Sequence, residues 1–128
     1  MSDVSVTVLV VDDEPDMRLI AKAFLESAGY DVVGEAIDGP DALDAYFSLD
    51  PPPIPTVVVL DNRMPGITGL EVAERMLART PDQLILLFTA FLTEEIEDRA
   101  AALGVAGCVA KSDAPSLPDR VNRLIATN

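Results

Sequence analysis

Apolar residues occur along the chain in short runs, separated by polar segments that contain glycine or proline. Five runs are rich in β-branched or other strand-forming residues, and the continuous ones are typical of strands covered on both faces. The predicted strands span residues 4–11, 30–36, 56–61, 83–90 and 106–111. The chain therefore contains material for a largely buried sheet.

Segments with helical character lie between these runs. Pro15 suits the first turn of the first helix and Gly29 its end, while Thr68 and Glu71 have the spacing of a capping box. The segment 50–55 contains four prolines and predicts a stiff, extended connection. The predicted helices span residues 16–29, 38–49, 67–79, 93–104 and 115–126.

The alternation of strands and helices predicts an α/β fold, a three-layer α-β-α arrangement around a five-stranded parallel sheet. A length of 128 residues, 49% of them apolar, suits one domain with one hydrophobic core. In such folds the working site lies at the carboxyl ends of the strands.

Composition narrows the function classes. The net charge of −13 argues against direct nucleic-acid binding, because the domain would repel phosphates. No apolar run is long enough to span a membrane, and the first residues do not resemble a secretory signal. The single cysteine, Cys108, cannot form an internal disulfide, which fits a cytoplasmic location. Histidine, the commonest metal ligand and general base, is absent.

Polar and charged residues that could form a functional site lie at the ends of the predicted strands. The stretch "VLVVDDEP" (8–15) runs from a buried strand directly into acids, which resist ionisation near a low-dielectric core unless a cation compensates them. The predicted sheet brings together the polar side chains at the strand ends. These side chains are Asp12, Asp13, Asp61, Thr89 and Lys111.

Each of these features also has a simpler explanation. Asp13 and Glu14 are suited to cap the helix that follows, and "DNRMPG" (61–66) is suited to an ordinary turn. Lys111 and Thr89, taken alone, are typical of a solvated lysine and of a strand end. Their joint occurrence at successive strand ends favours a functional site.

Four stretches resemble, in order and spacing, the receiver domain of bacterial two-component response regulators. They are "VLVVDDEP", "VVVLDNRMPGITGLE", "LLFTA" and "CVAK". The resemblance covers essentially the whole chain and implies one receiver domain over residues 1–128, of flavodoxin-like topology with strand order 2-1-3-4-5. It also implies that Asp61 accepts the phosphoryl group, that Thr89 is the switch hydroxyl and that Lys111 is the lysine of the site.

The resemblance further implies a divalent cation, usually Mg²⁺. Its ligands would be Asp12, Asp13, Asp61 and the backbone carbonyl of Arg63. Elementary chemistry agrees, because a carboxylate attacks an anionic phosphoryl donor poorly unless negative charge is neutralised.

The expected function is therefore Mg²⁺-dependent transfer of a phosphoryl group to Asp61 from a sensor histidine kinase or a small acyl phosphate. Such a domain is a signalling switch rather than an enzyme. The implied partner is the kinase. Further implied partners are a DNA-binding output domain of this same protein or a second copy of the chain. The domain itself is not expected to bind nucleic acid or a membrane. A stand-alone regulator and a receiver excised from a transcription factor both fit a chain that ends at Asn128.

Three features depart from the common receiver pattern. The residues "SD", rather than proline, follow Lys111, which resembles receivers attached to a helix-turn-helix output domain. Cys108 stands where an aromatic switch residue is usual, and the large residues Arg63 and Phe91 lie two positions after the acceptor and the switch hydroxyl. These departures bear on switching and on phosphoryl lifetime.

Three other functions fit parts of the sequence less well. A constitutive protein-binding module would not need all five site residues. An aspartyl phosphatase acting on small molecules typically has a second acid two residues after the nucleophile, where Arg63 stands. A flavin binder would need a Gly- or Ser/Thr-rich phosphate loop after the first strand, and the sequence there is acidic.

Overall fold

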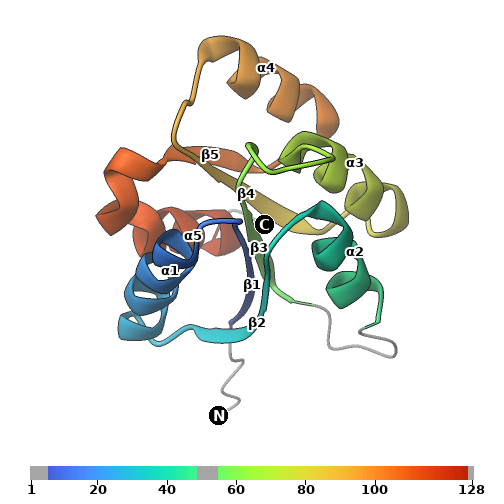
Figure 1. The fold of residues 1–128 in the computed structure, drawn as a ribbon. Coiled ribbons are helices and arrows are strands. Elements are labelled where there is room, and N and C mark those ends of the chain that lie inside the picture. The colour runs from blue at the N-terminus through green and yellow to red at the C-terminus, as the bar shows by residue number, and fades with distance from the viewer. Residues whose placement is uncertain (1–5, 49–54, 127–128) are drawn as a thin grey trace.

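The apolar runs form the centre of a parallel sheet. The computed structural model describes residues 6–48 and 55–126 (Figure 1). The strands are β1 (Thr7–Val11), β2 (Asp31–Ala36), β3 (Val57–Leu60), β4 (Leu84–Thr89) and β5 (Gly107–Ala110). They pair in the order β2-β1-β3-β4-β5, and every pairing is parallel. The predicted strand order 2-1-3-4-5 is confirmed.

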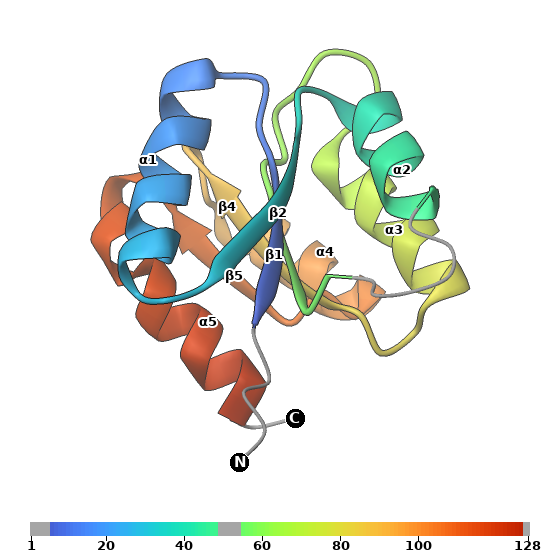
Figure 2. The same cartoon turned by 90° about the horizontal axis from the view of Figure 1, so that it is seen from below.

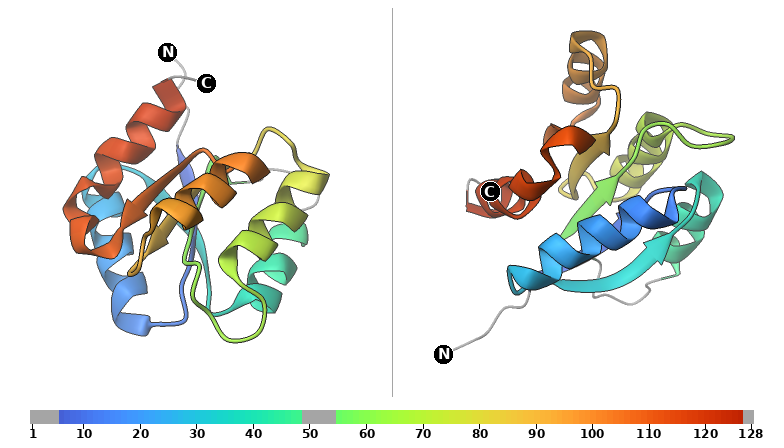
Figure 3. Two further views of the ribbon diagram at one scale, coloured as in Figure 1. Left: turned by 90° about the horizontal axis from the view of Figure 1, so that it is seen from above. Right: turned by 60° about the vertical axis from the view of Figure 1, so that its left-hand side comes forward.

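Helices cover both faces of the sheet. They are α1 (Pro15–Ser27), α2 (Gly39–Phe47), α3 (Gly69–Arg79), α4 (Glu94–Leu103) and α5 (Leu117–Ala126). Helices α1 and α5 lie on one face and α2 and α3 on the other, as Figure 2 shows; α4 lies beside α3 (Figure 3). None of these helices is long and apolar enough to cross a bilayer.

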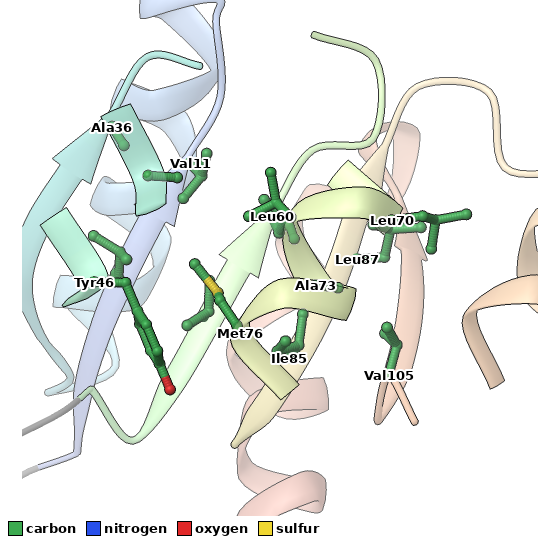
Figure 4. Packing of buried hydrophobic residues seen from close by; sticks show 14 of the residues in the cluster. Val11, Ala36, Tyr46, Leu60, Leu70, Ala73, Met76, Ile85, Leu87 and Val105 are labelled. Atoms are coloured by element: carbon green, nitrogen blue, oxygen red, sulfur yellow. The ribbon is translucent and has the colours of Figure 1, made fainter. Parts of the chain in front are cut away.

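The sheet separates two apolar clusters, because successive side chains of a strand point to opposite faces. Toward α1 and α5, Val10 and Phe88 pack with Leu25 and Val121. Toward α2 and α3, strand residues such as Leu60 and Ile85 contact helix residues. Figure 4 shows this second cluster, with Tyr46, Ala73 and Met76 directed at the sheet. Both faces of the central strands are thus covered, which explains their continuous apolar runs.

Local sequence signals explain where the helices begin and end. Pro15 occupies the first turn of α1, and the predicted capping box at α3 is present between Thr68 and Glu71. Gly104 ends α4 in the left-handed region, with φ of 97°, where a side chain would be strained. The predicted boundaries therefore agree with the observed ones to within a few residues.

The chain after β5 differs from the prediction. Residues 111–116 form a 3₁₀ helix, Lys111–Ser116, before α5 begins at Leu117, whereas the sequence predicted a strand to residue 111 and a helix from residue 115. The hydroxyl of Ser116 donates to the backbone and side-chain oxygens of Asp113 and closes this turn. Residues 4–5 of the first predicted strand, residue 49 and most of the proline-rich connection at 50–55 lie outside the described residues.

The start of α3 packs directly on the end of β3. A Cβ atom at Gly69 would collide with the carbonyl oxygen of Asp61 and lie 2.8 Å from the Cα of Asn62. Both obstacles are backbone atoms, which cannot rotate away as the end of a side chain can. Gly69 is therefore required for the close approach of helix and strand.

We expect Gly69→Ala to lower the free energy of unfolding by about 1–3 kcal/mol, the usual cost of overpacking. Gly34→Ala is the matched control, since its Cβ would meet only the Cδ1 atom of Leu9, at 3.2 Å. Urea denaturation of both variants measures the difference. An equal loss of unfolding free energy in the two variants would show that the backbone contact at Gly69 does not exclude a side chain there.

Candidate functional site

The strand ends predicted to converge do converge. Asp12 follows β1, Asp61 follows β3, Thr89 ends β4 and Lys111 follows β5. The loops that leave β1 and β3 lie side by side at one edge of the sheet, which is uppermost in Figure 2. The backbone N–H of Asp61 donates to the carbonyl of Val11 at 2.9 Å, so the two acid-bearing loops are joined where they leave the sheet.

Lys111 connects the acidic residues. Its ammonium nitrogen lies 2.8 Å from Asp12 Oδ2, 2.9 Å from Glu14 Oε1 and 3.2 Å from Asp61 Oδ2. The Lys111 side chain is only 7% exposed, and Asp12 and Asp61 are buried as well, whereas the Glu14 side chain is 60% exposed. The structure thus places Lys111 inside the site, not on the solvated surface.

One cation shared among three carboxylates leaves the site electrostatically unbalanced. Burial and the charge of Asp12 raise the pKa of Asp61, and the charge and hydrogen bond of Lys111 oppose this only in part. Burial alone would lower the pKa of Lys111, but hydrogen bonds to Asp12 and Glu14 and the charges of Asp61 and Asp12 raise it above its usual value. Lys111 is therefore held charged, while Asp61 carries a charge that is under-compensated.

Backbone contacts orient the acids. The Asp12 N–H donates to the carbonyl of Ala36 at 3.1 Å, and Asp12 Oδ1 accepts from the Glu14 N–H at 2.9 Å. Asp61 Oδ1 accepts from the Arg63 N–H at 3.3 Å. Each buried carboxylate therefore has one oxygen held by the backbone of its own loop and the other directed at Lys111.

The acid cluster has the donor chemistry of a hard-cation site. Asp12, Asp13, Glu14 and Asp61 each offer a carboxylate oxygen, and these four atoms lie within 4.8 Å of one another. Mg²⁺ prefers oxygen ligands, usually one or two carboxylates with waters completing its shell. Asp13 and Arg63 also line an open hollow of about 400 Å³ beside the acids. The residues present therefore fit Mg²⁺.

Comparison with known proteins gives the family. A family model described as the response regulator receiver domain matches residues 8–122. The chain belongs to this family. Receiver domains are the response-regulator component of two-component systems, which agrees with the resemblance found in the sequence.

Relatives support the assignment. The chemotaxis protein CheY of Thermotoga maritima is 30% identical over 109 residues, which are 85% of this chain and 88% of that protein. The receiver domain of the putative response regulator NarL from Mycobacterium tuberculosis is 31% identical, with a TM-score of 0.86 and coverage of 97% and 98% of the two chains. A LuxR-family two-component response regulator from Aurantimonas sp. SI85-9A1 is 28% identical, with a TM-score of 0.88 and coverage of 97% and 87%.

The coverage of other relatives is smaller. The chain spans about half the length of relatives whose names describe them as transcription regulators. Family membership sets aside the flavin binder and the small-molecule phosphatase as alternatives. A receiver domain that no longer accepts phosphate remains the alternative to a phosphorylated switch.

Thr89 carries a buried hydroxyl that has no hydrogen-bond partner among the described residues. Among the side chains that the structure describes, its Oγ1 is the one buried oxygen or nitrogen atom without a hydrogen bond. An unsatisfied buried hydroxyl costs stability unless another group supplies its hydrogen bond. Thr89 lies at the end of β4, where the sequence places it, and its role as the switch hydroxyl stays a prediction.

Arg63, in the loop after β3, and Phe91, in the loop after β4, contact each other. The Arg63 guanidinium carbon lies 4.8 Å from the centroid of the Phe91 ring, and the ring is 62% exposed. A cation–π contact at an exposed position contributes about 0.5–1 kcal/mol. The pair therefore forms a weak bridge between the loop after β3 and the loop after β4.

Cys108 occupies the expected place of the aromatic ring. It is half-buried on β5 and lines an open hollow of about 290 Å³ together with Ala100, Ala101 and Gly107. Burial and the charge of Glu97 raise the pKa of the thiol, which opposes formation of a reactive thiolate. Cys108 therefore acts as a small apolar residue beside α4.

Two site residues were not identified from the sequence. The sequence indicated Glu14 only as one of three adjacent acids and as a cap of the first helix, but it is a direct partner of Lys111. The side chain of Asn62 is buried, and its Oδ1 accepts from the Leu70 N–H at 3.0 Å, which attaches the loop after β3 to α3. Adjacency to Asp13 and to Asp61 was the available signal for these two residues.

We expect Asp61→Asn to stabilise the metal-free domain at neutral pH, because it removes an under-compensated buried charge while Lys111 keeps two acidic partners. A raised pKa means that the folded domain favours the protonated acid, so the parent loses stability as pH rises through that pKa. The gain in melting temperature should therefore shrink as the pH falls toward about 4. Asp44→Asn, on the exposed side of α2, is the control. A lower melting temperature for Asp61→Asn at neutral pH would contradict the charge imbalance.

Proposed function

We propose that this receiver domain accepts a phosphoryl group on Asp61. The observation that carries the proposal is the buried Asp61 carboxylate, 3.2 Å from Lys111 and grouped with three other carboxylates. An Asp61 oxygen forms the new bond to phosphorus, while the bond from phosphorus to the donor breaks and its electron pair leaves with the donor. The donor is the phosphohistidine of a sensor kinase or a small acyl phosphate.

The side chains divide the work of positioning and charge stabilisation. Lys111 is close enough to Asp61 to contact an oxygen of the transferred group and to remain paired with Asp12. The unpartnered hydroxyl of Thr89 is free to donate a hydrogen bond to a second oxygen.

Asp12, Asp13 and Asp61, with the backbone carbonyl of Arg63, would hold Mg²⁺. When bound, the cation supplies Lewis-acid neutralisation of the carboxylate and phosphoryl charges. The all-oxygen donor set and the excess negative charge of the cluster support this part of the proposal.

The phosphorylated domain acts as a switch rather than as a catalyst for other substrates. Contacts of the new phosphoryl group with Thr89 and Lys111 would favour one of two states and alter a surface formed by α4, β5 and α5. A sensor histidine kinase is the expected phosphoryl source. Relatives of about twice this length support a DNA-binding output domain of this same protein as a further partner. A second copy of the chain is the other candidate.

The phosphorylation assay uses acetyl phosphate and Mg²⁺ with intact-mass detection. The parent and Asp44→Asn should each gain the mass of one phosphoryl group, and chelation of Mg²⁺ should abolish the gain. Asp61→Asn should gain nothing, because it lacks the nucleophilic carboxylate. Labelling of Asp61→Asn at the parent level would exclude Asp61 as the acceptor. No labelling of the parent would instead support the constitutive binding module.

A second measurement addresses phosphoryl lifetime. The exposed Phe91 ring packs on Arg63, two residues after Asp61, so we expect Phe91→Ala to admit water and speed loss of the phosphoryl group several-fold. Leu19→Ala is the control, because Leu19 is exposed to a similar degree, 66%, on α1. The rate is followed by intact mass after donor removal. An unchanged rate in Phe91→Ala would show that the ring does not shield the site.

A further inference from the structure

Arg18 connects the acid-bearing loop to a neighbouring strand. Its Nη1 atom donates to the backbone carbonyl of Asp12 at 2.8 Å, and its Nε atom lies 3.5 Å from Oε1 of Glu35 on β2. The side chain is largely buried, and its own backbone N–H donates to the Glu14 carbonyl at 3.0 Å. Arg18 therefore contacts the backbone of the acid-bearing loop, whereas Lys111 contacts the carboxylates.

The hydrogen bond from Arg18 to the carbonyl of Asp12 helps to fix the direction in which the chain leaves β1. The carbonyl of Asp12 and the N–H of Asp13 belong to one planar peptide group, so holding the carbonyl also fixes the plane that leads into Asp13. The N–H of Asp12 is already held by the carbonyl of Ala36 at 3.1 Å. With Arg18 in place, both peptide groups that flank Asp12 are fixed.

We propose that Arg18 is a positioning residue for cation binding, which rests on the proposed function of the acid cluster. It holds the peptide between Asp12 and Asp13 so that the two neighbouring carboxylates face the same site. Glu35 anchors the guanidinium from β2, and the planar fork of arginine allows one side chain to engage both partners.

Lys22 provides an internal comparison. Its ammonium group lies 3.3 Å from Oε2 of the same Glu35, one turn further along α1. Glu35 therefore binds two basic residues, of which Arg18 reaches the carbonyl of Asp12. Loss of Lys22 removes a nearby positive charge and a Glu35 partner without changing the hydrogen bond to the acid loop.

A purely electrostatic role of Arg18 predicts the opposite change in Mg²⁺ affinity when Arg18 is replaced. A positive charge near the acids repels an incoming divalent cation, so its removal would strengthen binding. Loss of positioning weakens binding instead, because the carboxylates must then be ordered when the ion arrives. The neutral variant Arg18→Met and the charged variant Arg18→Lys separate these two effects.

Mg²⁺ affinity is measured by isothermal titration calorimetry on the unphosphorylated chain, well below the melting temperature of every variant. We expect Arg18→Met to weaken Mg²⁺ binding about 10-fold, the lower end of the usual effect of losing a hydrogen bond behind a metal ligand. Arg18→Lys, which keeps the charge and one donor, should recover part of the affinity. Lys22→Met should bind Mg²⁺ as the parent does.

The outcomes distinguish the possibilities. Tighter binding by Arg18→Met would assign Arg18 a charge effect alone. An unchanged affinity with a lower melting temperature would leave it a purely structural residue, and equal weakening by Lys22→Met would assign the effect to Glu35 rather than to the loop. Each result overturns the proposal, and amide NMR spectra verify that the variants are folded. If the parent itself does not bind Mg²⁺, the proposed function of the cluster and the Arg18 inference are both refuted. If the parent binds Mg²⁺, the variants test the role of Arg18 alone.

Discussion

The site depends on one ammonium group that serves three carboxylates. Lys111 lies within 3.2 Å of oxygens from Asp12, Glu14 and Asp61, and it is nearly inaccessible to solvent. Burial, and after it the charge of Asp12, raises the pKa of Asp61 even though Lys111 lies beside it. One positive charge among three carboxylates leaves a shortage of positive charge in the site. The same shortage makes the cluster receptive to a divalent cation, which a balanced ion pair would not be.

This arrangement imposes a requirement on the whole fold. The lysine and its partners come from segments up to 97 positions apart, and the parallel sheet brings their strand ends to one edge. The two apolar clusters hold the sheet between its helices, and the Asp61 N–H to Val11 carbonyl bond joins the central loops. The close contact of Gly69 with the backbone of Asp61 and Asn62 then fixes the start of α3 against the loop after β3.

The features particular to this receiver domain surround the acids. Phe91 packs on Arg63 beside the hollow that Asp13 lines, and Cys108 leaves a second hollow against α4. Arg18 donates to the backbone carbonyl of Asp12 and, among the described residues, to no carboxylate of the cluster. The fold thus brings the acids together at one edge of the sheet, and the proposals on cation binding and phosphoryl lifetime concern these neighbouring residues.

The sequence alone determined the element order, the parallel sheet and the main candidate residues. Apolar runs, Pro15, Gly104 and the capping box at Thr68 are signals carried by residues only a few positions apart, and they act before distant segments meet. The sequence also indicated Asp61 and Lys111, because strand ends of a parallel sheet share an edge.

Only the tertiary structure decided how these residues are partnered. The sequence did not show that Glu14 binds Lys111, that Arg18 reaches the Asp12 carbonyl, or that Thr89 is buried without a partner. It also did not predict the 3₁₀ helix that begins at Lys111. Ion pairs, burial and side-chain direction depend on how helices and strands distant in sequence pack together, and no local pattern of residues encodes that packing.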